Sequence, residues 1–126
     1  MIFINKNNLF VFFVFTLSFL LSSCAVQTDV NVFSQPKGSK PLGCPLEIYR
    51  NSNQITKEYE IIASINLEDS GFSVACGRGK AMTIIRDEAC AVGGDAVLIT
   101  NERGPDIFSS CYRANATILS YKEVTK

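Results

Sequence analysis

Apolar residues first form one long block near the start of the chain and later recur in shorter, patterned runs. The block, residues 9–21, is interrupted only by Thr16 and Ser18. A short lead with one cation, Lys6, precedes it and small residues follow it, which is the layout of a secretory signal. A bilayer-spanning helix needs roughly 20 apolar residues, which this block does not reach. We therefore predict a cleaved signal peptide rather than a membrane-spanning helix.

Four later runs have the character of β-strands: residues 46–49, 59–65, 96–100 and 112–121. The first begins with alternation, and the third is mostly apolar, which indicates a central strand buried on both faces. The second and fourth alternate over their length and so define one face each. These faces consist of Tyr59, Ile61, Ala63 and Ile65, and of Tyr112, Ala114, Ala116 and Ile118.

Residues 80–92 show the periodicity of an amphipathic helix instead. Their apolar residues recur at spacings of three and four, which places them on one side of a helix. The stripe is Met82, Ile85, Ala89 and Val92, widened by Ala81 and Ile84. Gly93 and Gly94 follow and predict a glycine cap at the helix end. The order strand, strand, helix, strand, strand predicts a small α+β domain, one helix packed on a mostly antiparallel four-stranded sheet.

The segment between the signal and the first predicted strand has a linker composition. Ser, Gln, Pro, Lys and Gly dominate its second half, residues 34–41, and we find no periodic apolar face there. Val30, Val32 and Phe33 are exceptions that could touch a lipid surface or a partner. The predicted organisation is a signal peptide (1–23), a lipidated N-terminus with a flexible linker (24–43) and a folded periplasmic domain (44–126).

The signal ends in Leu21-Ser22-Ser23-Cys24, which matches the bacterial lipobox. In such proteins the cysteine is acylated, with palmitate for example, and becomes the first residue after cleavage. Each buried methylene contributes about 0.8 kcal/mol, so several acyl chains hold a protein on a membrane. Ala25 rather than Asp follows the cysteine and favours the outer membrane. The alternative is a plain secreted protein in which Cys24 is a free or disulfide-bonded thiol.

Composition narrows the classes of function. Removing residues 1–23 from the 126 leaves 103, with 11 Lys/Arg against 12 Asp/Glu because Lys6 is the one charge lost. Without a basic surplus, nucleic acid is not an expected partner. The chain has no histidine, the commonest general base and metal ligand. We therefore predict that it is not an enzyme and has no cofactor, metal or small-molecule substrate.

Acylation of Cys24 would leave four cysteines: Cys44, Cys76, Cys90 and Cys111. An even number in a small exported domain predicts two disulfides. Metal binding and thiol exchange are weaker alternatives, because no Cys-x-x-Cys pair is present.

Residues 76–80 (Cys-Gly-Arg-Gly-Lys) suggest a phosphate loop. Val74 and Ala81 stand where that motif requires Gly and Ser or Thr. An anion-binding helix start remains as a hypothesis. The carboxylates are scattered along the sequence, and we expect them to form solvated surface. They are Asp87, Glu88, Asp95, Glu102 and Asp106.

Several motifs together resemble the RcsF-type outer-membrane lipoproteins. They are Leu46 to Asn51, Ile62-Ala63-Ser64 leading to Cys76, Gly93 to Ile99, and Cys111-Tyr112-Arg113 with Ala114. The strand after the helix is also similar to that of the small YbjQ-like domains. The resemblance implies an envelope-stress sensor with a lipidated N-terminus, a linker and a small disulfide-bonded domain.

The resemblance also implies a disulfide between Cys76 and Cys111, which would contribute on the order of 3–4 kcal/mol. The second disulfide of the family has no counterpart, since Thr117 stands where its last cysteine would be. Cys44 and Cys90 are left and form our hypothesis for a second pair. The linker, about 19 residues and at most roughly 60–70 Å long, is shorter than the family's barrel-threading linker.

The predicted function is accordingly that of an outer-membrane lipoprotein whose periplasmic domain binds other envelope proteins. The resemblance implies an outer-membrane β-barrel or an inner-membrane regulator as partner, and stress signalling as the output. Two alternatives stay open. One is a structural or assembly lipoprotein without signalling output, and the other is a thiol-active or metal-binding periplasmic protein.

Overall fold

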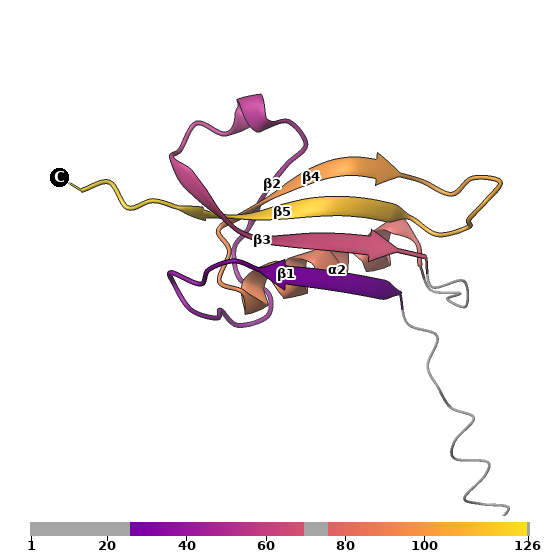
Figure 1. The fold of residues 1–126 in the computed structure, drawn as a ribbon, viewed down its shortest axis with the longest axis horizontal. Coiled ribbons are helices and arrows are strands. Elements are labelled where there is room, and N and C mark those ends of the chain that lie inside the picture. Colours follow the sequence, from indigo (N-terminus) through magenta and orange to yellow (C-terminus); the bar gives the residue numbers. More distant parts are fainter. Residues whose placement is uncertain (1–25, 70–75, 126) are drawn as a thin grey trace, which may run out of the picture.

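A twisted five-stranded sheet forms the body of the protein, and one helix lies along one of its faces (Figure 1). This computed structural model describes residues 26–69 and 76–125. The strands are β1 (Gln27–Val32), β2 (Glu47–Tyr49), β3 (Tyr59–Glu68), β4 (Ala96–Arg103) and β5 (Arg113–Tyr121). The helix α2 spans Arg78–Ala91, and a short 3-10 helix, η1, spans Ser52–Gln54. The predicted α+β architecture with one helix is confirmed for the described residues, whereas the predicted number of strands was wrong.

The sheet has the order β1-β3-β5-β4-β2. Strands β1, β3, β5 and β4 pair antiparallel in turn, whereas β2 pairs parallel with β4. β5, the last strand in the sequence, therefore occupies the centre. This agrees with a mostly antiparallel sheet and places β1 and β2 at the two edges.

The additional strand, β1, comes from the segment predicted to be linker. It runs antiparallel to β3, with Val30 opposite Ile65 and Val32 opposite Ala63. The strand forms because Thr28, Val30 and Val32 alternate with polar residues and Val30 packs against the core. Within residues 24–43, an edge strand thus replaces part of the predicted flexible linker. The signal peptide and Cys24 lie outside the described residues.

A bulge in β3 changes which side chains the strand turns inward. Its register with β5 shifts between Ile61 and Ala63. As a result Ile62 and Ala63 are both fully buried, while Ile61 is 53% exposed. The predicted face was right at Ala63 and Ile65 and wrong at Ile61, because a strict two-residue period cannot anticipate an inserted residue.

The helix ends as its sequence predicts. Gly93 has φ +80°, and its N–H donates to the carbonyl of Cys90, while that of Gly94 donates to Ala89. This pair of bonds is a Schellman cap. A side chain at Gly93 would overlap the carbonyl of Gly38, so glycine is also needed to bring the loop before β2 against the helix end.

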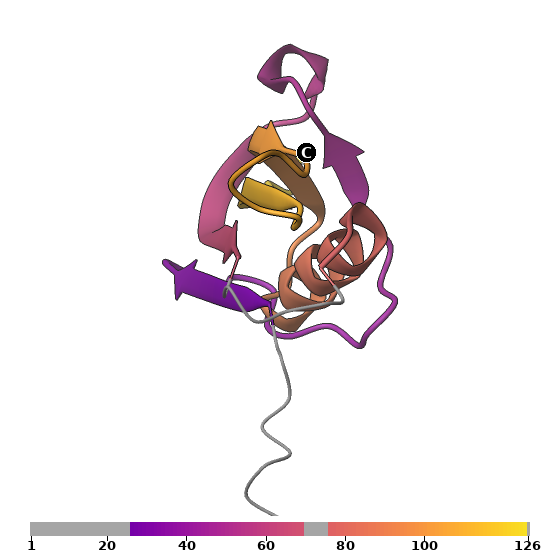
Figure 2. The ribbon, with the colours of Figure 1, turned by 90° about the vertical axis from the view of Figure 1, so that its right-hand side faces the viewer.

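The core lies between α2 and the inner face of the sheet (Figure 2). The helix contributes Ala81, Ile85 and Ala89, each at most 1% exposed. The sheet contributes Ala63, Ile65, Leu67, Val97, Ile99, Ala114, Ala116 and Ile118. Small alanines on β5 face the helix, which lets the two elements approach closely.

Candidate protein-interaction surface

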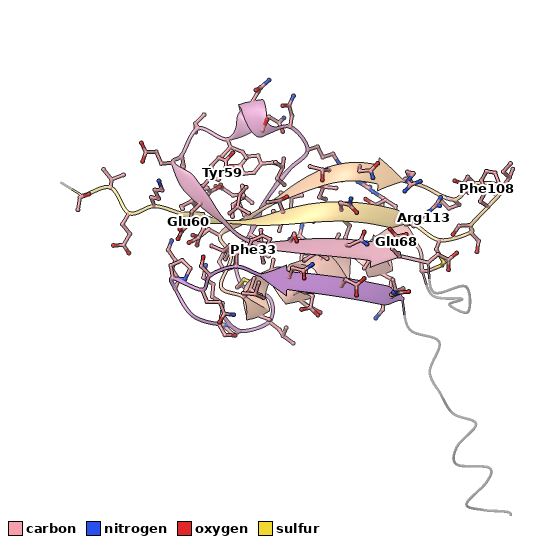
Figure 3. All side chains as sticks on the ribbon, viewed as in Figure 1. Phe33, Tyr59, Glu60, Glu68, Phe108 and Arg113 are labelled. Carbon is pink, nitrogen blue, oxygen red and sulfur yellow. A yellow bond between two sulfur atoms is a disulfide. The ribbon has the colours of Figure 1, made fainter. Side chains whose placement is uncertain are left out.

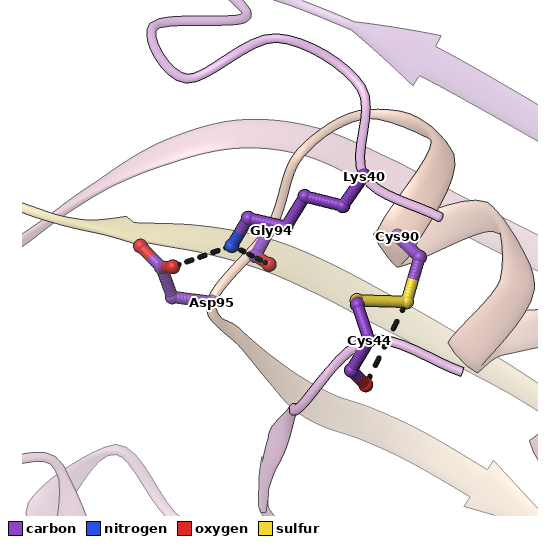
Figure 4. The surroundings of a disulfide bond; sticks show 5 residues. All are labelled: Lys40, Cys44, Cys90, Gly94 and Asp95. Atoms are coloured by element: carbon purple, nitrogen blue, oxygen red, sulfur yellow. Dashed lines mark hydrogen bonds and ion pairs between the residues drawn. A yellow bond between two sulfur atoms is a disulfide. The ribbon is translucent and has the colours of Figure 1, made fainter. Parts of the chain in front are cut away.

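Two disulfides tie the helix to the rest of the domain. Cys44 bonds to Cys90, joining the segment before β2 to the last turn of α2, with 5.9 Å between the Cα atoms (Figure 4). Cys76 bonds to Cys111, joining the segment before α2 to the segment before β5, with 4.9 Å between the Cα atoms. All four cysteines of the described residues are thus engaged, in the pairs hypothesised from the sequence. These disulfides hold both helix ends against the sheet.

Asp95, one of the carboxylates expected on the solvated surface, is instead a junction between segments. Its carboxylate accepts from Lys37 Nζ at 2.6 Å, from the backbone N–H of Tyr121 at 2.8 Å and from Lys40 Nζ at 2.7 Å. Figure 4 shows the last of these bonds. Lys40 Nζ also donates to the carbonyl of Gly94 at 2.8 Å. Burial alone would raise the pKa of Asp95, but these three donors lower it to about 2. The cluster holds the loop after β1 onto the start of β4.

The start of α2, considered as an anion site, is occupied by an internal ion pair. Arg78 Nε lies 3.3 Å from Glu102 Oε1, and Arg50 Nε lies 3.2 Å from the other oxygen of that carboxylate. Tyr112 donates to Glu102 as well, and burial followed by this bond raises the pKa of Tyr112 to about 12. The Arg78 guanidinium thus neutralises a carboxylate of the chain itself. The geometry gives no support for a phosphate site here.

A third polar cluster, around Glu47, lies at the end of the sheet opposite to Glu102. Glu47 on β2 accepts from the hydroxyls of Tyr121 and Tyr49 and from Lys57 Nζ. Hydrogen bonds from Tyr121, Tyr49 and Lys57, in that order of effect, lower the pKa of Glu47 to about 2. Lys57 Nζ also lies 4.4 Å from the Tyr121 ring centroid. The cluster joins β2 to β5 beneath residues 50–58.

Beside this cluster is an open hollow of about 680 Å³. Its lining consists of Thr56, Lys57, Glu58, Tyr121, Lys122, Glu123, Val124 and Thr125. Two lysines and two glutamates line it, so neither charge dominates. In residues 26–69 and 76–125 no three His, Cys, Asp or Glu side chains come together as metal ligands. The same residues contain no helix long and apolar enough to cross a membrane.

The outer side of β1 is one of the two backbone edges of the sheet, and the outer side of β2 is the other. Phe33 N–H donates to the carbonyl of Ile62 at 2.7 Å, in register with the β1–β3 ladder. Bonded and non-bonded pairs alternate along an antiparallel ladder. The odd-numbered residues of β1 therefore point their backbone groups toward β3. Thr28, Val30 and Val32 point theirs outward, to the edge that no described strand covers.

Exposed apolar residues lie where this edge ends. Phe33 is 63% exposed (Figure 3), its neighbour Val32 is 49% exposed, and Ile61 beside the β3 bulge is 53% exposed. β1 contains no lysine, proline or bulge, three of the devices that protect an edge strand from pairing, and its one charged residue is Asp29. We define the β1-edge surface as the outward backbone of Thr28, Val30 and Val32 together with the side chains of Phe33 and Ile61.

Val30, Val32 and Phe33 were exceptions within the predicted linker, but the strand that contains the two valines and ends before Phe33 was not predicted. The signal was the alternation of Thr28, Val30 and Val32 with Asp29 and Asn31. Comparison of the chain with models of known families, with curated proteins and with solved structures gives no match. The resemblance to RcsF-type lipoproteins therefore stays a prediction.

Proposed function

We propose that this protein is a lipid-anchored envelope protein, attached to the outer membrane through Cys24, whose periplasmic domain binds another envelope protein. The observation that carries the proposal is the β1-edge surface. An extended segment of a partner can add to such an edge as a further strand. The two disulfides support an oxidising compartment, because such bonds persist outside the cytosol.

Strand addition divides the recognition between backbone and side chains. The outward N–H and C=O groups of Thr28, Val30 and Val32 would bond to any extended segment and give affinity. Phe33 and Ile61 would contact apolar residues of the partner and favour particular sequences. An envelope-stress role follows if damage changes whether a partner reaches this edge, as the resemblance implies.

Photo-crosslinking tests the binding site in the processed protein in its own membrane. A photoreactive residue replaces Phe33, and the same residue at Val124, in the C-terminal tail, serves as the control position. We expect a discrete protein adduct from position 33 only. Val30→Pro should remove it, because proline lacks the outward N–H, while Val30→Thr keeps this N–H and should keep the adduct. Adducts insensitive to Val30→Pro would exclude strand addition.

The anchor is tested separately by the intact mass of protein purified from membranes. The mass should correspond to a chain that starts at acylated Cys24, with no alkylation until a reductant is added. An unacylated chain would disprove the membrane attachment, and thiols reactive before reduction would favour the thiol-active alternative. Deleting the protein and following a stress response separates a sensor from a structural lipoprotein.

A further inference from the structure

Two of the most exposed large apolar side chains in the described residues are neighbours in the loop between β4 and β5. Ile107 is 92% exposed and Phe108 is 87% exposed. Phe108 lies in the outer part of the loop, beyond the ends of the strands (Figure 3). Adjacent exposed residues of this kind indicate a surface that meets an apolar phase or a partner. We call this pair the apolar tip.

The loop that carries the apolar tip is fixed by its own hydrogen bonds. Asp106 Oδ1 accepts from the N–H groups of Phe108 at 2.8 Å and Ser109 at 2.9 Å, and Asp106 N–H donates to the carbonyl of Ser109. Arg113 donates to Asp106 Oδ2 at 2.6 Å. Below the tip, the disulfide of Cys111 fixes the loop to the segment before α2. The apolar side chains are thus held outward by a structured turn.

The apolar tip projects from the end of the sheet at which β1 begins. Gln27 lies opposite Glu68 at the end of β3, and the neighbouring strand β5 begins there with Arg113. Neighbouring strands are roughly 5 Å apart, so two strand spacings separate Gln27 from the base of the tip loop. In Figure 1 the tip and the start of β1 both lie at the right-hand end, and the C-terminal tail lies at the left.

Chain length then limits how far this end can be from the lipid anchor. Cys24 precedes Val26, the first described residue, by two positions, so their Cα atoms are at most about 7–8 Å apart. If Cys24 carries acyl chains in a bilayer, the start of β1 is held close to that bilayer, and the apolar tip at the same end of the sheet is within reach of it. The linker that would separate the domain from the membrane is instead largely folded, because β1 starts at Gln27.

Two of the cations next to the tip are already paired. Arg113 pairs with Asp106, and Arg78 pairs with Glu102. Charges that are paired cost less to bring to a low-dielectric surface than isolated ones. Arg103, the exposed last residue of β4, forms no ion pair with the described residues. Apart from this one cation, the contact would depend on apolar insertion rather than on attraction to anionic lipids.

We propose that Ile107 and Phe108 insert into the lipid surface that holds Cys24 and so fix the orientation of the domain on the membrane. The inference rests on the proposed lipid anchor. With two attachment points at one end, the domain stands on the bilayer with a defined face outward. The β1-edge surface then starts beside the lipid and runs away from it, toward Val32 and Phe33.

The chain contains no tryptophan, so the fluorescence of one introduced tryptophan reports on the surroundings of that position alone. Phe108→Trp and the control Val124→Trp replace side chains that are each 87% exposed, at opposite ends of the molecule. The full processed lipoprotein is reconstituted in phosphatidylcholine vesicles whose acyl chains carry bromine. We expect a blue-shifted emission quenched by brominated lipid for Phe108→Trp, and a solvent-like, unquenched emission for Val124→Trp.

The outcomes separate this inference from the anchor on which it rests. Unquenched emission from Phe108→Trp in protein that floats with the vesicles would overturn the inference and leave the anchor standing. Protein that does not float would overturn both. A blue shift without quenching by brominated lipid would overturn the inference in favour of a protein contact. Adding Ile107→Ser to Phe108→Trp should lower the quenching, because the inserted apolar area is reduced.

Discussion

At the scale of single residues, Asp95 shows how one carboxylate connects distant parts of the chain. Its donors come from positions 37, 40 and 121, on both sides of it in the sequence. We expected solvated surface at this residue because no local pattern in the sequence links it to either lysine. Only the tertiary fold, in which the loop after β1 crosses the start of β4, brings them within 2.7 Å.

We predict an acid-dependent loss of stability that originates at Asp95. Its pKa is lowered in the folded state, from 3.8 to about 2, so it stabilises the fold above the unfolded pKa and this contribution disappears as the pH falls toward 2. Screening by solvent limits the effect to on the order of 1 kcal/mol.

Urea unfolding of the wild type and of Asp95→Asn between pH 6 and pH 2 measures this contribution. The variant should be less stable at pH 6, and the difference should shrink toward pH 2. Asp29→Asn, a change on the exposed side of β1, serves as the control. A difference between wild type and Asp95→Asn that is constant over this range would contradict the linkage.

At the scale of elements, residues 27–32 form the strand β1 within a segment that we predicted to be a flexible linker. Its two faces were visible in the sequence as an alternation, but short runs of this kind also occur in unstructured segments. Residues 27–32 become a strand because they pair with β3, and this pairing depends on residues 63–68, far along the chain. The helix was easier to predict because its stripe and glycine cap are both local signals.

The β3 bulge and the parallel pairing of β2 were not predictable for a related reason. The bulge at Ile62 appears only when β3 is aligned with β5. The pairing of β2 with β4 connects segments separated by the helix and β3. Neither pairing register can be recognised from the local periodicity of the sequence.

Proline substitutions at neighbouring positions of β1 should differ in cost. Asn31 directs its N–H to β3, so Asn31→Pro removes a ladder bond and should reduce the free energy of unfolding by about 1–3 kcal/mol. Val30 directs its N–H outward, so Val30→Pro should cost less. Denaturant unfolding of both variants measures this, and equal losses, or none, would contradict the assigned strand geometry.

At the scale of the whole molecule, the two disulfides interleave. In chain order the cysteines are Cys44, Cys76, Cys90 and Cys111, and the first pairs with the third and the second with the fourth. The sequence separations of 46 and 35 residues are long. In the chain-entropy model each such loop contributes about 4 kcal/mol. Native pairing therefore skips the nearest cysteine in both cases.

We predict that rapid oxidation of the reduced, unfolded chain gives mostly non-native disulfides. Loop closure favours near neighbours, so Cys76–Cys90, the pair with the shortest separation in sequence, should form first, in competition with Cys90–Cys111. A glutathione redox mixture should convert them to the native pairs by thiol exchange. Peptide mapping after each treatment identifies the pairs. Native pairing in high yield with a strong oxidant and no free thiol would contradict this expectation.

The central position of β5 has a consequence for how the chain is made. Before residues 113–121 are available, the sheet exists only as two separate halves, β1 with β3 and β2 with β4. Two-stranded sheets are marginal in water. A chain that emerges from its N-terminus onward therefore has little to fold around until its final strand arrives and closes both ladders. The strand order thus delays formation of the sheet until residues 113–121 are available. If the protein is exported as proposed, this delay would suit a polypeptide that passes through a narrow channel in an extended form.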